Sequence, residues 1–171
     1  MKSVYIVRHA PKDNITGELT DEGRLLAKSL QEKYTGFFDQ VIASEIKRTQ
    51  ETAYLLTNIH PRIDPRANIM PFSDETYEKL REKSKLHSQR VTGVMYEDNS
   101  LANVVHAHTI QFINMIKETH KSLAANQRAL ICSHDVTMVP AYQTLKYGFI
   151  QETAQQFKPL SGFIYAGDSS I

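Results

Sequence analysis

Short apolar runs alternate along this chain with longer segments in which apolar residues recur at helical spacings. The short runs are rich in β-branched residues, as is typical of buried strands, and they cover residues 4–9, 39–44 and 128–133. Helical spacings predict helices over about residues 21–34, 45–58, 100–125 and 137–146. Pro140 fits the last of these helices only if it lies in the first turn. Because strand and helix alternate, we expect a parallel sheet with right-handed crossover connections.

The remaining segments predict less regular structure. Three prolines between residues 60 and 72 indicate a loop, with a brief edge strand near residues 68–70. Residues 73–99 are polar and charged, and their pattern fits either a helix with an exposed charged surface or a mobile lid. The last few residues are expected to fray. Closing strands are expected at residues 157–158 and 162–166.

The composition limits the class of protein. With 171 residues, 41% of them hydrophobic, the chain can bury one good core, so we expect a single domain over residues 1–171. Lys and Arg total 20 against 19 Asp and Glu, a balance that predicts neither a nucleic-acid partner nor a membrane partner. No apolar run reaches membrane-spanning length, and the single cysteine, Cys132, fits a reducing compartment, so we expect a cytoplasmic protein. The pattern fixes no oligomeric state.

Polar side chains follow the predicted strands at the points where these strands end. Arg8 and His9 end the first strand, Ser44 ends the second, and His134 follows the third. Arg48 lies one turn into the helix after Ser44, and the free N–H groups at the start of that helix favour a bound phosphate. Since ligands of open α/β sheets bind outside the carboxyl ends of the strands, we expect both arginines and both histidines to converge on one anion site.

Four stretches of the chain carry a family resemblance. They are, in chain order, VYIVRHA, LTDEGRLLAKSL, VIASEIKRTQETA and ALICSHD. In order and spacing they resemble the four signature blocks of the histidine phosphatase superfamily, which is also called the phosphoglycerate mutase-like family. The resemblance implies a three-layer α/β/α sandwich with a mostly parallel sheet, as in phosphoglycerate mutase-like proteins. It leaves out about residues 73–99, which we expect to form a variable insertion or lid.

The resemblance implies a metal-independent phosphatase that needs no cofactor. His9 would be the nucleophile and would carry a phosphohistidine intermediate, while Arg8 and Arg48 would bind the phosphoryl oxygens. His134 would complete the pocket, with Ser44 as a further substrate-binding residue. Guanidinium groups suit this task because they match phosphoryl oxygens bidentately. The substrate would be a phosphomonoester or a phosphohistidine, on a small molecule or on a phosphoprotein.

Two departures from the family favour a small phosphatase over a sugar-phosphate mutase. Ala10 follows the Arg-His pair, where the larger branch has glycine. The chain contains no tryptophan, whereas the mutases carry one soon after the first histidine. The alternatives are a phosphotransferase or mutase of the same superfamily and a catalytically silent phosphate-binding module. A dinucleotide-binding module is set aside because no glycine-rich turn follows the first strand.

A general acid is needed to protonate the leaving oxygen of a phosphate ester, and two places in the chain could supply it. Asp135, directly after His134, resembles the acid of one branch of the superfamily and is the favoured candidate. Asp74 and Glu75 are the alternative, because the other branch takes a glutamate from the loop after the third strand. Each carboxylate also has a structural interpretation, as a helix N-cap for Asp135 and as a solvated helix start for the other two.

Overall fold

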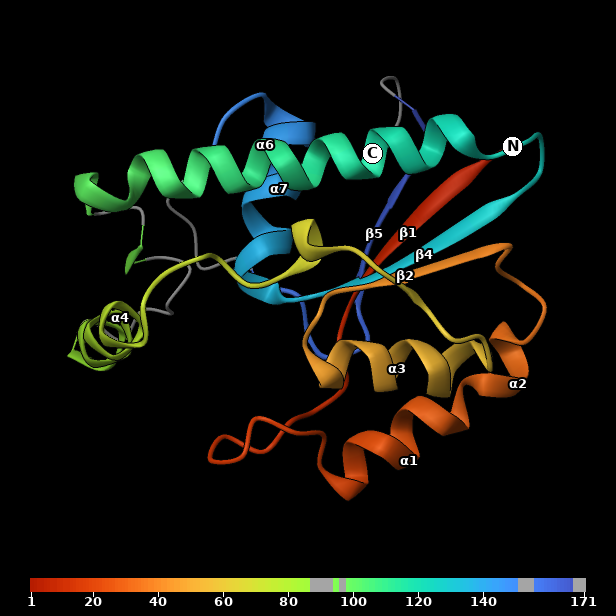
Figure 1. Ribbon diagram of the computed structural model, residues 1–171, viewed down its shortest axis with the longest axis horizontal. Helices are drawn as coiled ribbons and strands as arrows, with labels where there is room; N and C mark the ends of the chain where they lie inside the picture. Colours follow the sequence, from red (N-terminus) through yellow and green to blue (C-terminus); the bar gives the residue numbers. More distant parts are fainter. Residues whose placement is uncertain (87–93, 96–97, 151–155, 168–171) are drawn as a thin grey trace.

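A five-stranded sheet forms the centre of the protein (Figure 1). The computed structural model describes residues 1–86, 94–95, 98–150 and 156–167. The strands are β1 (Ser3–Arg8), β2 (Gln40–Ala43), β3 (Arg62–Ile63), β4 (Arg128–Ser133) and β5 (Gly162–Tyr165), in the spatial order β3-β2-β4-β1-β5. The first four strands run parallel, whereas β5 pairs antiparallel with β1. The sheet is therefore mostly parallel, which confirms the prediction from the alternating pattern.

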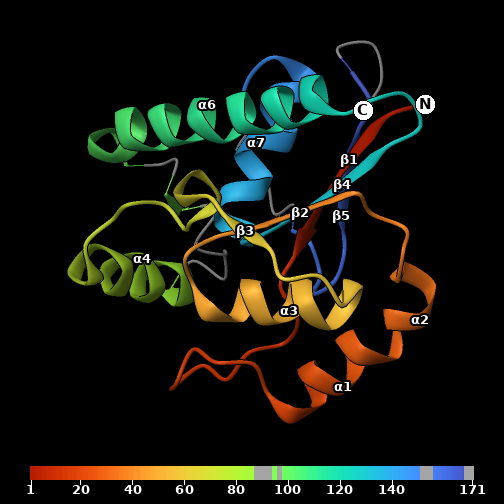
Figure 2. The ribbon, with the colours of Figure 1, turned by 45° about the vertical axis from the view of Figure 1, so that its right-hand side comes forward.

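Helices cover both faces of this sheet (Figures 1 and 2). One face packs against α1 (Asp21–Ser29), α2 (Gln31–Tyr34) and α3 (Lys47–Thr57), and the other against α6 (Asn99–Ser122) and α7 (Asp135–Tyr147). Each face has its own buried core, with Ala53 and Leu56 on the first side and Phe112 and Met138 on the second. The predicted three-layer α/β/α sandwich is thus confirmed. None of the described helices combines the length and hydrophobicity that a membrane span requires.

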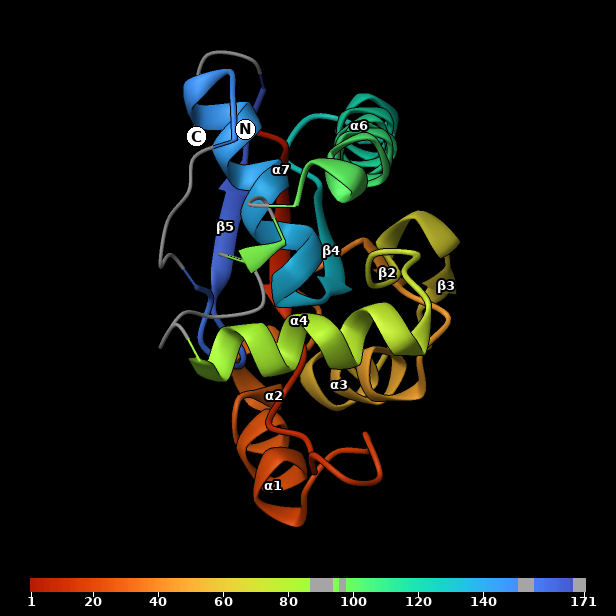
Figure 3. The same ribbon diagram turned by 90° about the vertical axis from the view of Figure 1, so that its left-hand side faces the viewer.

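α4 (Asp74–Leu86) lies beside the sandwich, on the side where the parallel strands end (Figures 2 and 3). A third apolar cluster connects it to the first half of α6. The cluster contains Met70, Leu80, Val94, Met95 and Val105. The segment predicted to be a charged helix or a lid therefore begins with a helix. Residues 87–93 and 96–97 of that segment lie outside the described residues.

The helix predicted over residues 21–34 is divided into α1 and α2 by a tighter turn at Leu30. The Leu30 N–H donates to the carbonyl of Ala27, three residues back, at 3.2 Å. After this turn, the ring of Tyr34 in α2 packs against two phenylalanine rings that also contact Tyr5 of β1. The break thus lets α2 cover the end of the sheet with aromatic side chains.

The edge strand of the sheet lies earlier in the chain than predicted. Arg62–Ile63 pairs with β2, whereas residues 68–70, the predicted location, form no strand. Pro65 starts a short 3-10 helix, η1 (Pro65–Ala67), which turns the chain away from β2. The carbonyl of Asn68 is then bound by a side chain, because Thr137 Oγ1 donates to it at 2.7 Å. His108 Nε2 of α6 lies 3.0 Å from the same oxygen, so this carbonyl contacts side chains of α6 and α7 and not a strand.

Of the two predicted closing strands, β5 forms and the segment at residues 157–158 does not. The N–H of Phe157 donates to Asp135 Oδ1 at 2.8 Å, and its carbonyl accepts from Arg8 Nη1 at 2.6 Å. Two side chains at the strand ends thus take the main-chain groups that a strand would need. Residues 168–171, which were expected to fray, lie outside the described residues.

α7 begins at Asp135, and this start places Pro140 beyond the first turn. Since proline has no N–H, it cannot donate to the carbonyl of Val136, four residues back. The expectation that Pro140 lies in the first turn is therefore wrong. Pro140 is buried, and the apolar area that its ring buries offsets part of the lost hydrogen bond.

Candidate active site

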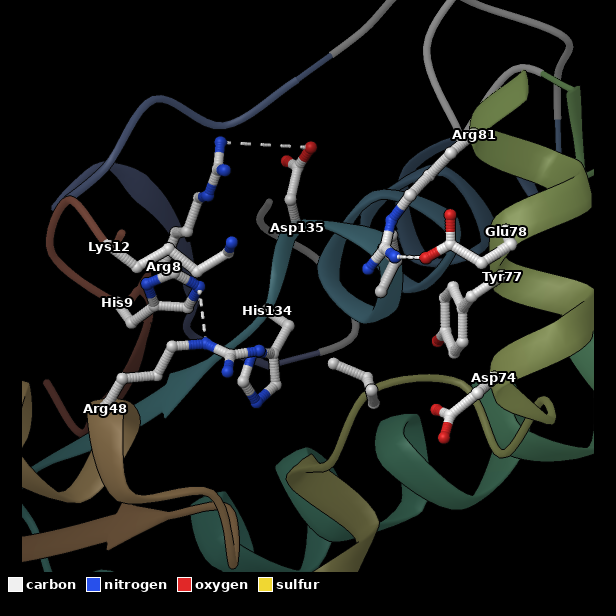
Figure 4. Close-up of a pocket in the computed structure, with 12 residues that line it drawn as sticks. Arg8, His9, Lys12, Arg48, Asp74, Tyr77, Glu78, Arg81, His134 and Asp135 are labelled. Carbon is white, nitrogen blue, oxygen red and sulfur yellow. Dashed lines mark hydrogen bonds and ion pairs between the residues drawn. The ribbon is translucent and has the colours of Figure 1, made fainter. Parts of the chain in front are cut away.

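The carboxyl ends of β1, β2 and β4 meet at a cavity of about 320 Å³ (Figure 4). Arg8 ends β1, His134 and Asp135 follow β4, and Arg48 lies in the first turn of α3, after β2. The cavity is lined by Arg8, His9, Lys12, Arg48, Ile69, Asp74, Tyr77, Glu78, Arg81, His134, Asp135 and Val136. The structure therefore brings both arginines, both histidines and Asp135 to one place.

His9 is held as a neutral imidazole in one tautomer. Its side chain is buried, and Nδ1 lies 2.7 Å from the carbonyl oxygen of Ala10. Because a carbonyl oxygen can only accept, Nδ1 carries the proton and donates it, while Nε2 carries the lone pair. Burial, followed by the charges of Arg48 and Arg8, lowers the pKa of His9 to about 3. At neutral pH His9 is therefore uncharged, with a nucleophilic nitrogen at Nε2.

Arg48 joins the two histidines. Its Nε–H donates to Nε2 of His9 at 3.2 Å, and its Nη2 donates to Nδ1 of His134 at 3.3 Å. The two imidazole rings lie 5.2 Å apart between centroids. A third bond, from Nη1 to the carbonyl of Gly17 at 3.3 Å, ties the guanidinium to the loop after β1. Arg48 thus holds a planar group of donors between two ring nitrogens, as Figure 4 shows for the contact with His9.

Ser44 lies behind His134, outside the lining of the cavity. It is fully buried, and Nε2 of His134 donates to its Oγ at 3.0 Å. The direction follows because the other ring nitrogen, Nδ1, accepts from Arg48. The Ser44 hydroxyl also accepts from the N–H of Ile46 and bonds the Thr49 hydroxyl at 2.7 Å. Ser44 therefore accepts from His134 in the tautomer that Arg48 selects, from a position that a substrate does not reach through the cavity.

His134 is neutral for the same reason as His9. Burial lowers its pKa well below the ordinary value, and the charge of Arg48 acts in the same direction. In this tautomer Nδ1 of His134 is the acceptor on the cavity side, and Nη2 of Arg48 donates to it. In the structure, the contact of His134 at the cavity is therefore with the guanidinium of Arg48.

Asp135 holds the segment at Phe157 beside Arg8. Its Oδ1 accepts the N–H of Phe157 at 2.8 Å, and its Oδ2 lies 4.0 Å from Arg8 Nη1. The N-cap of α7 is His134, so Asp135 is the first helical residue and does not cap the helix. Both Arg8 and Asp135 line the cavity, which leaves the carboxylate at the edge of the predicted anion site.

α4 supplies the outer wall of the cavity. Asp74 lines this wall, whereas Glu75 does not, because its carboxylate is exposed and pairs with Lys79 at 2.6 Å. Tyr77, Glu78 and Arg81 also line it, and none of these three was predicted from the sequence. The spacing i, i+3, i+4 and i+7 from Asp74 to Arg81 places these residues on one helical face, and this spacing is the signal that could have found them.

Positive charge is concentrated in this cavity. Burial, followed by Arg48 and Arg81, lowers the pKa of Lys12. Burial and Arg8 likewise lower the pKa of Arg48. Cations that destabilise one another in this way are stabilised when an anion binds between them. The arrangement therefore suits a phosphoryl group next to Nε2 of His9.

Comparison with known proteins identifies the class to which this chain belongs. The family model of the histidine phosphatase superfamily (branch 1) matches residues 4–159. The protein therefore belongs to this superfamily, as the four sequence blocks predicted. No curated protein matches the sequence.

Solved structures share the fold at low sequence identity. Phosphoserine phosphatase from Entamoeba histolytica is 17% identical, with a TM-score of 0.67 over 96% of this chain and 89% of that chain. The alpha-ribazole phosphatase from Shigella flexneri is 20% identical, with a TM-score of 0.64 over 92% of this chain and 86% of that chain. Phosphoglycerate mutase from Bacillus anthracis is 13% identical, with a TM-score of 0.58 over 95% of this chain and 87% of that chain. The fold is thus of the phosphoglycerate mutase-like type.

Proposed function

We propose that this protein is a phosphatase that hydrolyses phosphomonoesters through a phosphohistidine intermediate on His9. The observation that carries the proposal is the contact between His9 and Arg48, because it puts a neutral nucleophilic nitrogen 3.2 Å from a guanidinium group at the wall of a cavity. Two of the similar structures bear phosphatase names, which supports hydrolysis as the reaction. The third is a mutase, so the fold alone does not choose between the two.

In the first step, Nε2 of His9 attacks phosphorus in line with the leaving oxygen. The bond from Nε2 to phosphorus forms, and the bond from phosphorus to the leaving oxygen breaks. For this attack Arg48 must turn its Nε–H from Nε2 to a phosphoryl oxygen. Arg8 and Arg48 then neutralise the charge that spreads over the phosphoryl oxygens in the transition state.

Asp135 is the proposed general acid of this step. It gives its proton to the leaving oxygen, so the alcohol departs uncharged. In the second step a water molecule attacks the phosphorus of the phosphohistidine, and Asp135 takes a proton from that water. The bond from phosphorus to Nε2 breaks, inorganic phosphate leaves, and His9 returns to its neutral form.

The proposal assigns the positive charge of the site to Arg8 and Arg48 and requires no metal ion or cofactor. Guanidinium groups offer paired donors that match phosphoryl oxygens, which a single ammonium group cannot do. A cavity of about 320 Å³ lies at the lower end of the size range of small-molecule sites. A small phosphorylated molecule is therefore the proposed substrate, in preference to a phosphoprotein.

Hydrolysis of p-nitrophenyl phosphate in the presence of a chelator tests the proposal. Wild type should turn over, and His9→Ala should lose at least about 1,000-fold in kcat/KM because it removes the nucleophile. His60→Ala is the matched control, since His60 is exposed and stacks on Tyr54 away from the cavity. Wild type that binds phosphate without turnover would instead be a silent phosphate-binding module. Transfer of the phosphoryl group to an added alcohol in place of water would identify a phosphotransferase.

Two further variants in the same assay test the assignment of the general acid. For these variants an alkyl phosphate replaces p-nitrophenyl phosphate, because an alkoxide is a poorer leaving group than p-nitrophenolate and depends more on protonation. Asp135→Asn should then lose about 100-fold or more in kcat. Near-normal activity of Asp135→Asn together with a large loss in Asp74→Asn would move the acid to α4. The proposal does not assign this role to Glu75, which pairs with Lys79 and is not among the residues that line the cavity.

A further inference from the structure

The wall that α4 presents to the cavity differs in charge from the phosphoryl end. Arg8, Arg48 and Lys12 are the cations near His9, and each lowers the pKa of His9. α4 instead presents two carboxylates, Asp74 and Glu78, and one guanidinium group, Arg81. A substrate whose phosphoryl group sits at His9 therefore directs its alcohol portion toward a different set of side chains.

The charges on this wall do not cancel. Glu78 is paired with Arg81, three residues further along α4 (Figure 4). Asp74 forms no such ion pair within the part of the chain that the structure describes, although its side chain lines the cavity. The wall that faces the leaving group therefore carries one uncompensated negative charge, which favours a positively charged group.

An aromatic ring completes the same wall. Tyr77 lies between the two carboxylates along α4 and lines the cavity. Its hydroxyl donates to the carbonyl of Met70 at 2.8 Å, and its ring packs on Phe72 with 5.5 Å between centroids. The ring is thus fixed in place before a substrate binds. A fixed aromatic ring beside a carboxylate is a favourable environment for an ammonium group, through its π-electrons and through charge.

We propose that the substrate is a small phosphomonoester whose alcohol carries an ammonium group, bound at Asp74, Tyr77 and Glu78. This inference rests on the proposed function, because it places the phosphoryl group at His9. These residues of α4 then select the alcohol portion of the substrate. The chemical step is still carried out by His9 and Asp135. An alcohol with a carboxylate at this position is disfavoured, since it would face Asp74.

Three esters of two-carbon alcohols test the proposal. In O-phosphoethanolamine, ethyl phosphate and 2-phosphoglycolate, the alcohol carries an ammonium group, no charge and a carboxylate, respectively. In wild type we expect kcat/KM to fall in that order, by about tenfold between the positive and the negative ester. The three alcohols differ as leaving groups, so absolute rates are not compared. The decisive quantity is the kcat/KM for O-phosphoethanolamine divided by the kcat/KM for ethyl phosphate, and this ratio is compared between each variant and wild type.

Variants of α4 supply that comparison. Asp74→Asn and Glu78→Gln should each lower the ratio severalfold. Glu82→Gln, a matched loss of carboxylate charge on an exposed part of the same helix, should leave it unchanged. A wild-type ratio that none of these variants changes, or an equal loss on all three esters, would overturn the inference.

The assay also separates this inference from the proposed function. If p-nitrophenyl phosphate is hydrolysed and the three esters show no preference for the ammonium group, the phosphatase assignment stands and the specificity proposal fails. If no phosphate ester is hydrolysed at all, the proposed function fails first.

Discussion

Arg48 donates its Nε–H to Nε2 of His9 across 3.2 Å, so the guanidinium lies directly against the lone pair of the nucleophile. The same guanidinium donates to His134 and to the carbonyl of Gly17. A phosphoryl group must compete for these donors, and in doing so it frees the nitrogen that attacks it. Binding of the phosphate and exposure of the nucleophile are therefore one event in the proposed mechanism.

This relationship predicts that Arg48→Lys is severely impaired although the charge is retained. An ammonium group cannot bind two phosphoryl oxygens and the ring nitrogens in one plane. We expect kcat/KM to fall by about 100- to 1,000-fold, equivalent to about 3 to 4 kcal/mol of transition-state stabilisation. Arg62→Lys, which affects an arginine paired with Asp64 away from the cavity, is the control. Activity within threefold of wild type in Arg48→Lys would contradict the proposed role.

The low pKa of His9 predicts that stability falls as the pH falls below neutrality. The pKa is about 3 in the folded protein against an ordinary value of 6.5. Between these values the unfolded chain binds a proton that the folded protein does not. The contribution of His9 is therefore complete above pH 6.5 and is lost as the pH falls toward 3, by about 1.4 kcal/mol per pH unit. The pKa of His134 is shifted in the same direction.

Denaturant unfolding at several pH values between about 4 and 7 measures this slope. His9→Gln should reduce the slope, because glutamine does not titrate, whereas His60→Gln should not. A free energy of unfolding that stays constant from pH 7 to pH 4 in wild type would contradict the assigned protonation state.

Ser44→Ala tests the hydroxyl network behind His134. The substitution removes the acceptor of a buried imidazole N–H and should lower the free energy of unfolding by about 1 to 3 kcal/mol. It should also remove the hydrogen bond of Nε2–H, so the ¹⁵N chemical shift of His134 Nε2 should change. Ser29→Ala is the control, since the exposed Ser29 hydroxyl donates to the carbonyl of Leu26 within α1. An unchanged Nε2 shift in Ser44→Ala would contradict the hydrogen bond between His134 and Ser44.

Gly23→Ala tests how the loop after β1 is held on α1. A Cβ atom at Gly23 would lie 2.2 Å from the carbonyl oxygen of Pro11, so the helix and the loop must move apart. We expect a loss of about 1 to 3 kcal/mol in the free energy of unfolding. Glu22→Ala, at the exposed neighbouring position, should cost much less. Equal stability of the two variants would contradict the close approach of α1 to Pro11.

The strand ends could be predicted from the sequence because local signals define them. Arg8 and His9 directly follow a short β-branched run, and His134 follows another, so the parallel order of the strands is enough to place them at one edge. Arg48 is similarly placed by its distance from the end of β2. The roles of the polar neighbours of these residues were harder to predict from the sequence, because a hydroxyl at a strand end, such as that of Ser44, can face either the cavity or the interior.

The α4 wall and the segment at Phe157 could not be predicted in the same way. α4 is held near the strand ends by the apolar cluster around Met70, Leu80 and Val105, whose members are distant in sequence. Phe157 is placed by main-chain bonds to Arg8 and Asp135, which leave no pattern in the sequence. Both features depend on tertiary contacts: α4 lines the cavity, and the segment at Phe157 binds Arg8 and Asp135, which also line it.

The most direct test of the phosphohistidine mechanism is to trap the phosphoenzyme. Wild type is mixed with O-phosphoethanolamine or p-nitrophenyl phosphate, quenched within one turnover under alkaline conditions that preserve phosphohistidine, and mapped by peptide mass spectrometry. The phosphohistidine mechanism predicts one phosphoryl group on His9, absent in His9→Ala and formed at a rate no slower than steady-state turnover. Turnover without a labelled His9, or a phosphoryl group on another residue, would contradict it.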